Sequence, residues 1–183
     1  MMLHRRRALA FLAGATVSPA LAQTPAMNRI TAFAFSFAAL DGGTIRLADH
    51  AGKPIMVVNT ASLCGYTPQY TGLQEVWTRF KDRGLLLVGV PSNDFGGQEP
   101  GGATEIDETP HHQYGVTFPI TAKAEVKGTG AHPIYEQPAD TPRWNFHKYL
   151  IGRDGHIAAV FPSAVEPTDT RVITAIAKEL GSG

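Results

Sequence analysis

The chain has 183 residues, of which 43% are hydrophobic, and its 16 Lys and Arg balance its 16 Asp and Glu. This length suits one domain with a sizeable core. Beyond the first few residues the sequence has no basic run and no basic patch interleaved with aromatic residues. Nucleic-acid binding therefore has little support.

The first 22 residues are typical of a cleavable export signal. Basic residues at 4–7 precede a short apolar run at 8–17, and small residues occupy both positions that define a cleavage site after Ala22. The apolar run is well short of the roughly 20 residues that a membrane-spanning helix needs, so we expect no stable membrane anchor. We predict export to the periplasm, and the pair Arg6 and Arg7 also permits the twin-arginine route.

The chain that remains after this cleavage, residues 23–183, is expected to be a single domain. It carries 13 Lys and Arg against 16 Asp and Glu, so it is weakly acidic. Cys64 is the only cysteine in the sequence. In an oxidising compartment paired cysteines tend to form disulfides, but a lone cysteine has no partner in its own chain. Cys64 is therefore a free thiol, and its presence in such a compartment indicates a chemical role.

Apolar patterning predicts strands and helices that alternate along the chain. Residues 33–37 and 44–47 are short predicted strands that flank a Leu-Asp-Gly-Gly turn at 40–43, which indicates a β-hairpin. Residues 54–59 and 85–90 are continuous apolar runs, typical of parallel strands buried on both faces. Between them, residues 69–81 repeat apolar side chains at helical spacing, with Gly84 as the stop signal. The order predicts a right-handed βαβ unit.

The second half of the chain predicts a hairpin and a closing helix. Residues 104–114 are a weaker helix candidate, because Pro110 is expected to kink the helix or start a turn. Residues 144–151 and 156–161 are predicted strands, and residues 169–180 form an amphipathic helix. We therefore predict an α/β protein with the thioredoxin fold: an N-terminal β-hairpin and a mixed central sheet flanked by helices.

Cys64 lies where the predicted strand 54–59 gives way to the predicted helix 69–81. A thiol at a helix N-terminus faces unpaired backbone N–H groups and the positive end of the helix dipole, and both favour the thiolate. A lone buried cysteine is more often an inert apolar residue. The flanking sequence must therefore decide between the two interpretations.

Three segments resemble, in order and spacing, the three signatures of the glutathione peroxidase family. They are Asn-Thr-Ala-Ser-Leu-Cys-Gly-Tyr-Thr at 59–67, Pro-Ser-Asn-Asp-Phe-Gly-Gly-Gln-Glu-Pro-Gly at 91–101 and Trp-Asn-Phe-His-Lys-Tyr-Leu at 144–150. The resemblance covers essentially all of residues 29–181. It implies a catalytic cysteine assisted by a glutamine, a tryptophan and an asparagine, which the motifs place at Cys64, Gln98, Trp144 and Asn145.

Elementary energetics explain why a thiol would need these neighbours. A helix N-terminus supplies about 0.3–1 kcal/mol, less than the roughly 1.36 kcal/mol that moves a pKa by one unit. A hydrogen bond to a charged group contributes about 1.5–3 kcal/mol, so the Gln98 and Asn145 amides and the Trp144 indole are expected to stabilise the thiolate. Taken singly, Trp144 also fits a core aromatic residue, and the two amides fit turn caps.

Three residues depart from the pattern of the family. Ser92 stands where cysteine is common, and Asp94 stands where glutamine is usual. We expect Asp94 to face solvent or cap the loop, because an anion aimed at Cys64 would oppose thiolate formation. Pro110 stands where thioredoxin-dependent relatives carry a resolving cysteine. The resemblance therefore implies a one-cysteine peroxidase, whose sulfenic acid is attacked by an outside thiol.

The sequence thus predicts a peroxidase that reduces hydrogen peroxide or organic hydroperoxides through Cys64. The external reductant is glutathione, a thioredoxin-like protein or another thiol. A thioredoxin-like reductase would need a second thiol, where this chain has Thr67. A redox sensor or thiol-binding protein without peroxidase turnover is the alternative, since it would tolerate one thiol without requiring the three donors.

Other ligands find little support in the sequence. The histidines lie at no metal-ligand spacing, and the glycine-rich residues 96–101 lack the lysine of a phosphate-binding loop. We therefore predict no metal and no cofactor. Residues 127–143 are short where tetrameric relatives carry an insertion used in assembly, which indicates a monomer.

Overall fold

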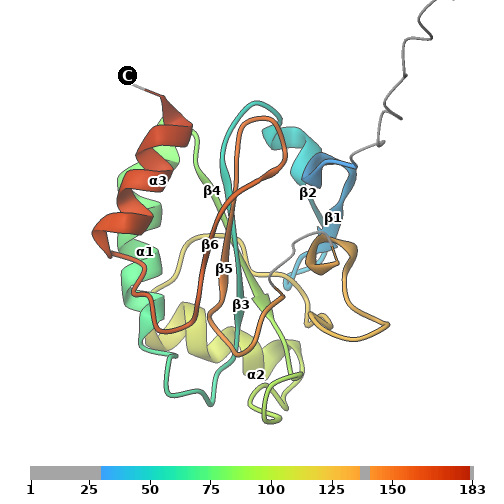
Figure 1. The fold of residues 1–183 in the computed structure, drawn as a ribbon. Helices are drawn as coiled ribbons and strands as arrows, with labels where there is room; N and C mark the ends of the chain where they lie inside the picture. Colours follow the sequence, from blue (N-terminus) through green and yellow to red (C-terminus); the bar gives the residue numbers. More distant parts are fainter. Residues whose placement is uncertain (1–29, 137–140, 182–183) are drawn as a thin grey trace, which may run out of the picture.

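The computed structural model describes residues 30–136 and 141–181 and is built around a four-stranded sheet (Figure 1). Its strands, β3 (Ile55–Thr60), β4 (Leu86–Pro91), β5 (Lys148–Ile151) and β6 (Ile157–Phe161), lie in the order β4-β3-β5-β6. β3 pairs parallel with β4 and antiparallel with β5, so the sheet is mixed. All residues of β3 and β4 are buried, as their continuous apolar runs predicted.

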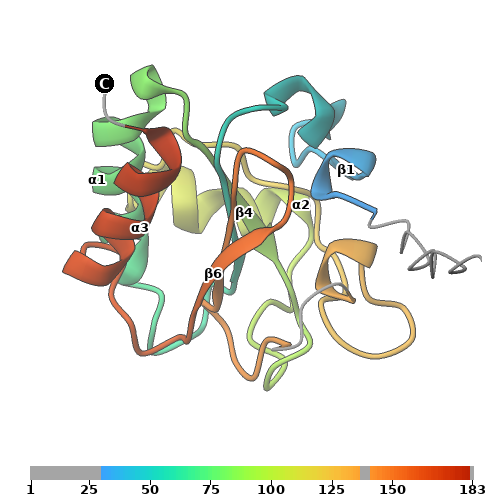
Figure 2. The ribbon, with the colours of Figure 1, turned by 45° about the horizontal axis from the view of Figure 1, so that its top comes forward.

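Two helices cover one face of this sheet. Figures 1 and 2 show α1 (Gln69–Phe80) and α3 (Thr170–Leu180) side by side there. α1 connects the parallel strands β3 and β4, which confirms the predicted βαβ unit. Asp169 caps α3 by accepting a hydrogen bond from the Arg171 N–H at 2.9 Å, as the sequence pattern at this helix start favours.

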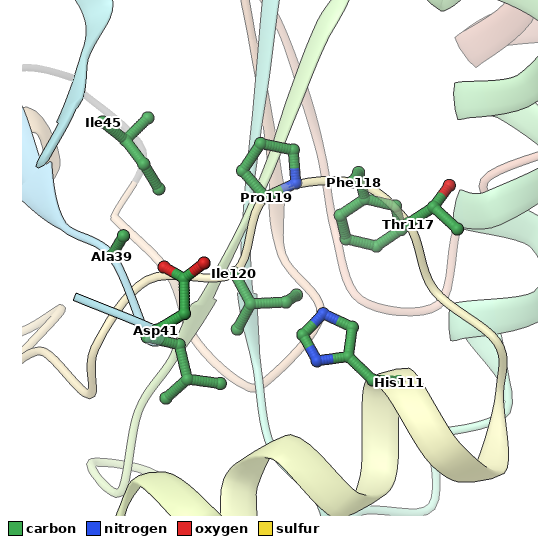
Figure 3. Close-up of a pocket in the computed structure, with 9 residues that line it drawn as sticks. Ala39, Asp41, Ile45, His111, Thr117, Phe118, Pro119 and Ile120 are labelled. Carbon is green, nitrogen blue, oxygen red and sulfur yellow. The ribbon is translucent and has the colours of Figure 1, made fainter. Parts of the chain in front are cut away.

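The predicted N-terminal hairpin forms a separate two-stranded sheet. β1 (Ser36–Ala38) and β2 (Thr44–Arg46) pair antiparallel. β1 begins three residues later than predicted, because Ala32–Ala34 form a 3-10 helix. A hollow of about 360 Å³ lies between this hairpin and the segment that carries His111 and Phe118. In Figure 3, Asp41 and His111 lie on opposite sides of Ile120 in this hollow, whose lining includes none of the four predicted catalytic residues.

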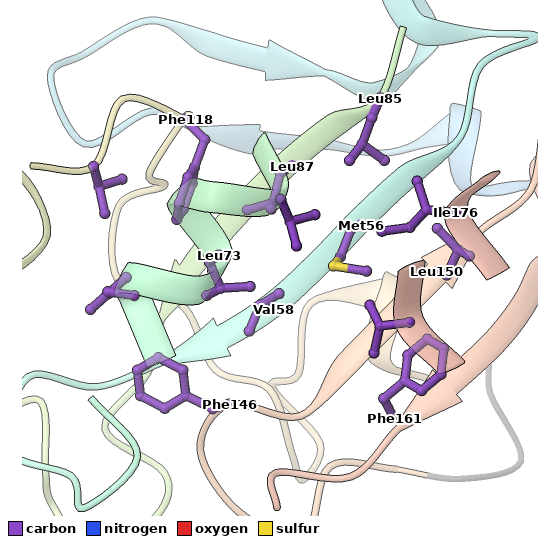
Figure 4. Close-up of a cluster of buried hydrophobic side chains, with 14 of the residues drawn as sticks. Met56, Val58, Leu73, Leu85, Leu87, Phe118, Phe146, Leu150, Phe161 and Ile176 are labelled. Carbon is purple, nitrogen blue, oxygen red and sulfur yellow. The ribbon is translucent and has the colours of Figure 1, made fainter. Parts of the chain in front are cut away.

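The core divides into two clusters, one on each face of the sheet. Met56 and Val58 point toward α1 and α3, where Figure 4 shows them near Leu73 and Ile176. Residues at odd positions of β3 point the opposite way, into a cluster with side chains of the N-terminal hairpin, among them Phe37. The period of two along a strand explains this alternation and buries β3 completely.

Two segments differ from the sequence prediction. The helix expected at 104–114 is a short α-helix, α2 (Ala103–Asp107), followed by π-helix at Glu108–Gln113. Pro110 lies within this wider helical segment and does not end it. The strand expected at 144–151 begins only at Lys148, because Phe146 has a positive φ of 63° and the preceding residues form a turn.

The predicted export signal at residues 1–22 lies outside the described residues. Among the helices of residues 30–136 and 141–181, none combines the length and the apolar character needed to cross a bilayer.

Candidate active site

Cys64 lies in a series of tight turns between β3 and α1, and 8% of its surface is exposed. α1 begins only at Gln69, five residues later. The expectation that Cys64 occupies the N-terminus of this helix is therefore wrong. The helix dipole falls off within the first turn, so it contributes less at Cys64 than the sequence suggested.

A backbone group takes the place of the helix terminus. The Tyr66 N–H donates to Cys64 Sγ at 3.4 Å. Thr67 holds this turn in shape, because its hydroxyl accepts from the Cys64 N–H at 3.1 Å and donates to the Ala61 carbonyl at 2.8 Å. Sequence reasoning missed Thr67 as a structural residue and treated it only as a missing second cysteine.

The loop that carries Gln98 is joined to the cysteine loop by two hydrogen bonds. The Leu63 N–H donates to the Gln98 carbonyl at 3.0 Å, and the Ser62 hydroxyl donates to Glu99 Oε2 at 3.2 Å. Burial raises the pKa of the Glu99 carboxyl, and the hydrogen bond from Ser62 opposes this shift. Gln98 is thus placed next to the cysteine loop through its backbone.

Lys123 fastens the same loop from outside. Its ammonium donates to the Glu99 carbonyl at 3.1 Å and to the Gly101 carbonyl at 2.6 Å. No sequence pattern singles out this lysine, because it lies more than twenty residues away and acts on backbone oxygens.

Trp144 lies over the glycine-rich part of the Gln98 loop and keeps 40% of its surface exposed. Its ring centroid is 5.9 Å from that of Phe95. Gly96 has a φ of 68°, and a Cβ added to it would come within 3.4 Å of the Trp144 ring. The positive φ favours glycine at 96, and a side chain there would be in van der Waals contact with the indole.

Asn145 is fully buried and contacts Gln98 directly. Its Nδ2 donates to Gln98 Oε1 at 2.9 Å. Asn145 Oδ1 is buried and has no hydrogen-bond partner among the residues that the structure describes. The structure therefore brings Gln98 and Asn145 together. Gln98 lies on the loop that is hydrogen-bonded to the cysteine loop, and Asn145 follows Trp144 in the chain. In the described ranges the hydrogen bond to Sγ comes from Tyr66, so donation by the three side chains stays a prediction.

The sequence predicts that Asp94 faces solvent or caps the loop, and in the structure its carboxylate caps a neighbouring loop. Its Oδ2 accepts from the Val126 N–H at 2.6 Å and from the Lys127 N–H at 3.2 Å. Ser92 is fully buried, and its hydroxyl accepts from the Asp94 N–H at 3.3 Å. The carboxylate of Asp94 is therefore held by two backbone donors that lie 32 and 33 residues further along the chain.

A hollow of about 610 Å³ opens beside the site, with Tyr66, Trp144, His147 and Ser163 in its lining. It adjoins the cysteine turn through Tyr66, whose backbone N–H contacts the sulfur. Within residues 30–136 and 141–181, no group of three or more His, Cys, Asp or Glu side chains is arranged to hold a metal ion.

Comparisons with known proteins identify the family. The profile described as glutathione peroxidase matches residues 32–137. The chain is similar to a hydroperoxy fatty acid reductase, gpx1, of Synechocystis sp., with 43% identity over 153 residues that cover 76% of this chain and 90% of that protein. A glutathione peroxidase of Lactococcus lactis is 41% identical over 143 residues, covering 74% of this chain and 91% of the relative.

Solved structures share the architecture. The crystal structure of Trgpx in apo form has a TM-score of 0.63 and 32% identity, and covers 80% of this chain and 95% of that chain. A thiol:disulfide interchange protein from Chlorobium tepidum has a TM-score of 0.62 at 17% identity, over 80% of this chain and 93% of its own, and shares the fold alone. The predicted thioredoxin fold and family resemblance are thus confirmed. The chain belongs to the glutathione peroxidase family and is a thiol peroxidase.

Proposed function

We propose that the protein reduces hydrogen peroxide and organic hydroperoxides at Cys64 in a one-cysteine cycle. The observation that carries the proposal is the position of the only thiol in the chain. Cys64 is 8% exposed, its sulfur accepts from the Tyr66 N–H at 3.4 Å, and the residue before it is hydrogen-bonded to Gln98. Cys64 is buried at the edge of a core cluster, and the hydrogen bond from Tyr66 to its sulfur distinguishes it from a cysteine with apolar contacts alone.

In the first step the thiolate of Cys64 attacks one oxygen of the peroxide and the O–O bond breaks. The departing oxygen takes up a proton and leaves as water or an alcohol, and Cys64 becomes a sulfenic acid. An external thiol then attacks the sulfur, releases water and forms a mixed disulfide. A second thiol releases Cys64 as a thiol and leaves as the oxidised disulfide of the reductant.

Gln98, Asn145 and Trp144 are the proposed donors to the reacting sulfur and the departing oxygen. The oxygen and nitrogen of a side-chain amide are similar in shape, so the 2.9 Å contact between Asn145 and Gln98 also fits a bond that Gln98 donates. If the oxygen and nitrogen positions are exchanged in both amides, Gln98 donates to Asn145. The buried atom of Asn145 that has no partner then becomes an N–H donor. Neutral donors stabilise developing negative charge without a permanent ion pair.

The proposal includes long-chain hydroperoxides among the substrates. Leu63 is 65% exposed and Trp144 is 40% exposed, so two large apolar side chains reach the surface on the loops that border Cys64. A relative with 43% identity is named a hydroperoxy fatty acid reductase. An apolar surface beside the thiol would bind an acyl chain whose hydroperoxide reaches the sulfur.

A peroxide-consumption assay on residues 23–183 tests this function. Hydrogen peroxide and a fatty acid hydroperoxide are offered in turn, each with glutathione, thioredoxin or a small dithiol as the reductant. We expect turnover with at least one thiol, and none for Cys64→Ser, because a serine hydroxyl has no accessible anion near neutral pH. Turnover by a folded Cys64→Ser variant would place the chemistry elsewhere.

A redox sensor is the second candidate, since it also needs one oxidisable thiol. It predicts rapid oxidation of Cys64 by peroxide but no repeated turnover with any of the three reductants. The packing of Trp144 over Gly96 and the Gln98–Asn145 hydrogen bond favour the enzyme, because a sensor has no need of these three side chains as donors.

We further infer that the protein acts outside the cytoplasm as a monomer. The basic residues at 4–7, the short apolar run at 8–17 and the small residues before position 23 support export. The short segment between Lys127 and Arg143 supports the monomer. Size-exclusion chromatography with light scattering tests the second point, and a stable dimer or tetramer would contradict it.

A further inference from the structure

The side chain and the backbone of Asn59 are hydrogen-bonded to one turn of the chain, at residues 144–147. Asn59 is the fifth residue of β3 and is fully buried. Its Nδ2 donates to the Trp144 carbonyl at 3.1 Å, and its Oδ1 accepts from the His147 N–H at 3.1 Å. In the backbone, the Asn59 carbonyl accepts from the Phe146 N–H at 2.6 Å, and the Asn59 N–H donates to the His147 carbonyl at 3.3 Å.

The turn held in this way has an unfavourable backbone. Phe146 is the only non-glycine residue with a positive φ in the ranges that the structure describes, at 63°. Such a conformation persists only when its surroundings hold it in place. Here the Phe146 ring packs edge-on against the ring of Tyr70 in α1, with the ring centroids 5.3 Å apart, and Lys148 Nζ donates to the Phe146 carbonyl at 2.7 Å.

The same turn begins with two of the proposed donors, Trp144 and Asn145. Its orientation therefore decides where the indole and the amide lie relative to Cys64. Asn59 reaches both sides of the turn, since it bonds residues 144, 146 and 147. The strand that contains Asn59 continues directly into the cysteine loop.

We propose that Asn59 is a positioning residue for peroxide reduction, which acts through Trp144 and Asn145 and does not touch the substrate. The inference rests on the proposed function of Cys64. An asparagine suits the role because one short side chain supplies both a donor, for the Trp144 carbonyl, and an acceptor, for the His147 N–H. Alanine loses both bonds and leaves two backbone groups unpaired.

The first test separates the two half-reactions. In single-turnover experiments, Asn59→Ala should lower the rate constant for oxidation of Cys64 by hydrogen peroxide about 10- to 100-fold, since two donors lose their fixed positions. Reduction of the sulfenic acid by a small thiol should change less than about twofold, because it does not use those donors. Equal loss in both half-reactions, or no loss in either, would overturn the inference.

Thr121→Val is the matched control. Thr121 is fully buried and donates one side-chain hydrogen bond, to the Ala122 carbonyl at 2.7 Å, away from the site. It should leave both rate constants unchanged. If wild-type Cys64 itself is not oxidised by peroxide, the proposed function fails. If the wild type is oxidised rapidly and Asn59→Ala matches it, only the positioning role fails.

Asn59→Asp keeps the inference testable if the alanine variant does not fold. A carboxylate at this position presents only acceptors and repels the Trp144 carbonyl, whereas a protonated carboxyl again offers one donor and one acceptor. Burial raises the pKa of a carboxyl. The ratio of the Asn59→Asp oxidation rate to the wild-type rate should therefore rise several-fold as the pH falls from about 8 to about 5.5. A ratio that stays flat over this range would contradict the positioning role.

Discussion

Asn145 and Gln98 are joined by a side-chain hydrogen bond of 2.9 Å across 47 residues of sequence. The bond links two side chains that lie on different loops, one after β4 and one before β5. Each amide fixes the orientation of the other, so a change in one is expected to alter what the other can donate.

Loss of either amide should therefore slow oxidation of Cys64 by about 10- to 1,000-fold, and the two losses should not add. In Gln98→Ala, Asn145 loses the partner that orients it, so a second change to Asn145→Ala removes little more. Rapid-mixing measurements of the oxidation rate for both single variants and the double variant give the coupling. Trp144→Phe, which removes the indole donor, should slow the same step.

Gln74→Ala is the control for this series. It removes an amide with two hydrogen bonds to Thr117, at 2.9 and 2.8 Å, on the exposed side of α1. Its oxidation rate should equal that of the wild type. Wild-type rates in all three site variants would remove the proposed donor set, and strictly multiplicative effects would show that the two amides act independently.

Oxidation by one equivalent of peroxide should add a single oxygen to Cys64. Cys64 is the only cysteine in the sequence, so an internal disulfide cannot form. Intact-protein mass spectrometry with a sulfenic-acid trap measures this product. Excess peroxide should carry Cys64 on to the sulfinic and sulfonic acids, and added thiol should protect it as a mixed disulfide.

One result would contradict the role of the external thiol. If the oxidised protein stays reducible after prolonged excess peroxide without thiol, another group resolves the sulfenic acid. A backbone nitrogen that closes a sulfenamide, or Cys64 of a second molecule, would then replace the external thiol in the first resolving step.

The central elements could be predicted from the sequence because their signals are local. The apolar runs of β3 and β4 and the helical spacing of Leu73, Val76 and Phe80 in α1 follow directly from burial. The turn at Trp144 could not be predicted in this way. It contains a positive φ at Phe146 and is hydrogen-bonded to Asn59, which lies 85 residues before Trp144.

The residues of the site also divide into those that the sequence predicts and those that depend on contacts between distant segments. The resemblance to a family indicated Cys64, Gln98, Trp144 and Asn145, but no periodicity in the sequence pairs Gln98 with Asn145. The backbone donor at Tyr66 was not foreseen, since it depends on the turns that precede α1. Hydrogen bonds to backbone oxygens, such as those of Lys123, leave no pattern in residue types.

The export signal makes a prediction that is independent of the site. Protein recovered from its native host should begin at Gln23, because cleavage after Ala22 follows small residues at both defining positions. N-terminal sequencing of the envelope fraction measures this. An intact Met1 there would contradict cleavage. Replacing Arg6 and Arg7 with lysine tests the route, and unaffected export would exclude the twin-arginine pathway.

The buried ammonium group of Lys148 should make the free energy of unfolding depend on pH. Burial lowers its pKa from 10.5 to about 8, and the charge of Glu166 opposes the shift. The folded protein therefore releases this proton at a lower pH than the unfolded chain does. Between about pH 8 and pH 10.5 the unfolded state binds more protons, so the free energy of unfolding should rise with pH.

Lys148→Met isolates this effect, since methionine has a similar shape and no charge. Denaturant titrations should show that the wild type gains up to about 3 kcal/mol relative to Lys148→Met between pH 7 and pH 10.5. Burial also raises the pKa of Tyr70 and Tyr135, which lowers stability above pH 10 as the unfolded chain loses those protons. That loss occurs in both proteins and cancels in the difference. Parallel curves for the two proteins would mean that Lys148 keeps its ordinary pKa and that its burial costs the folded state nothing.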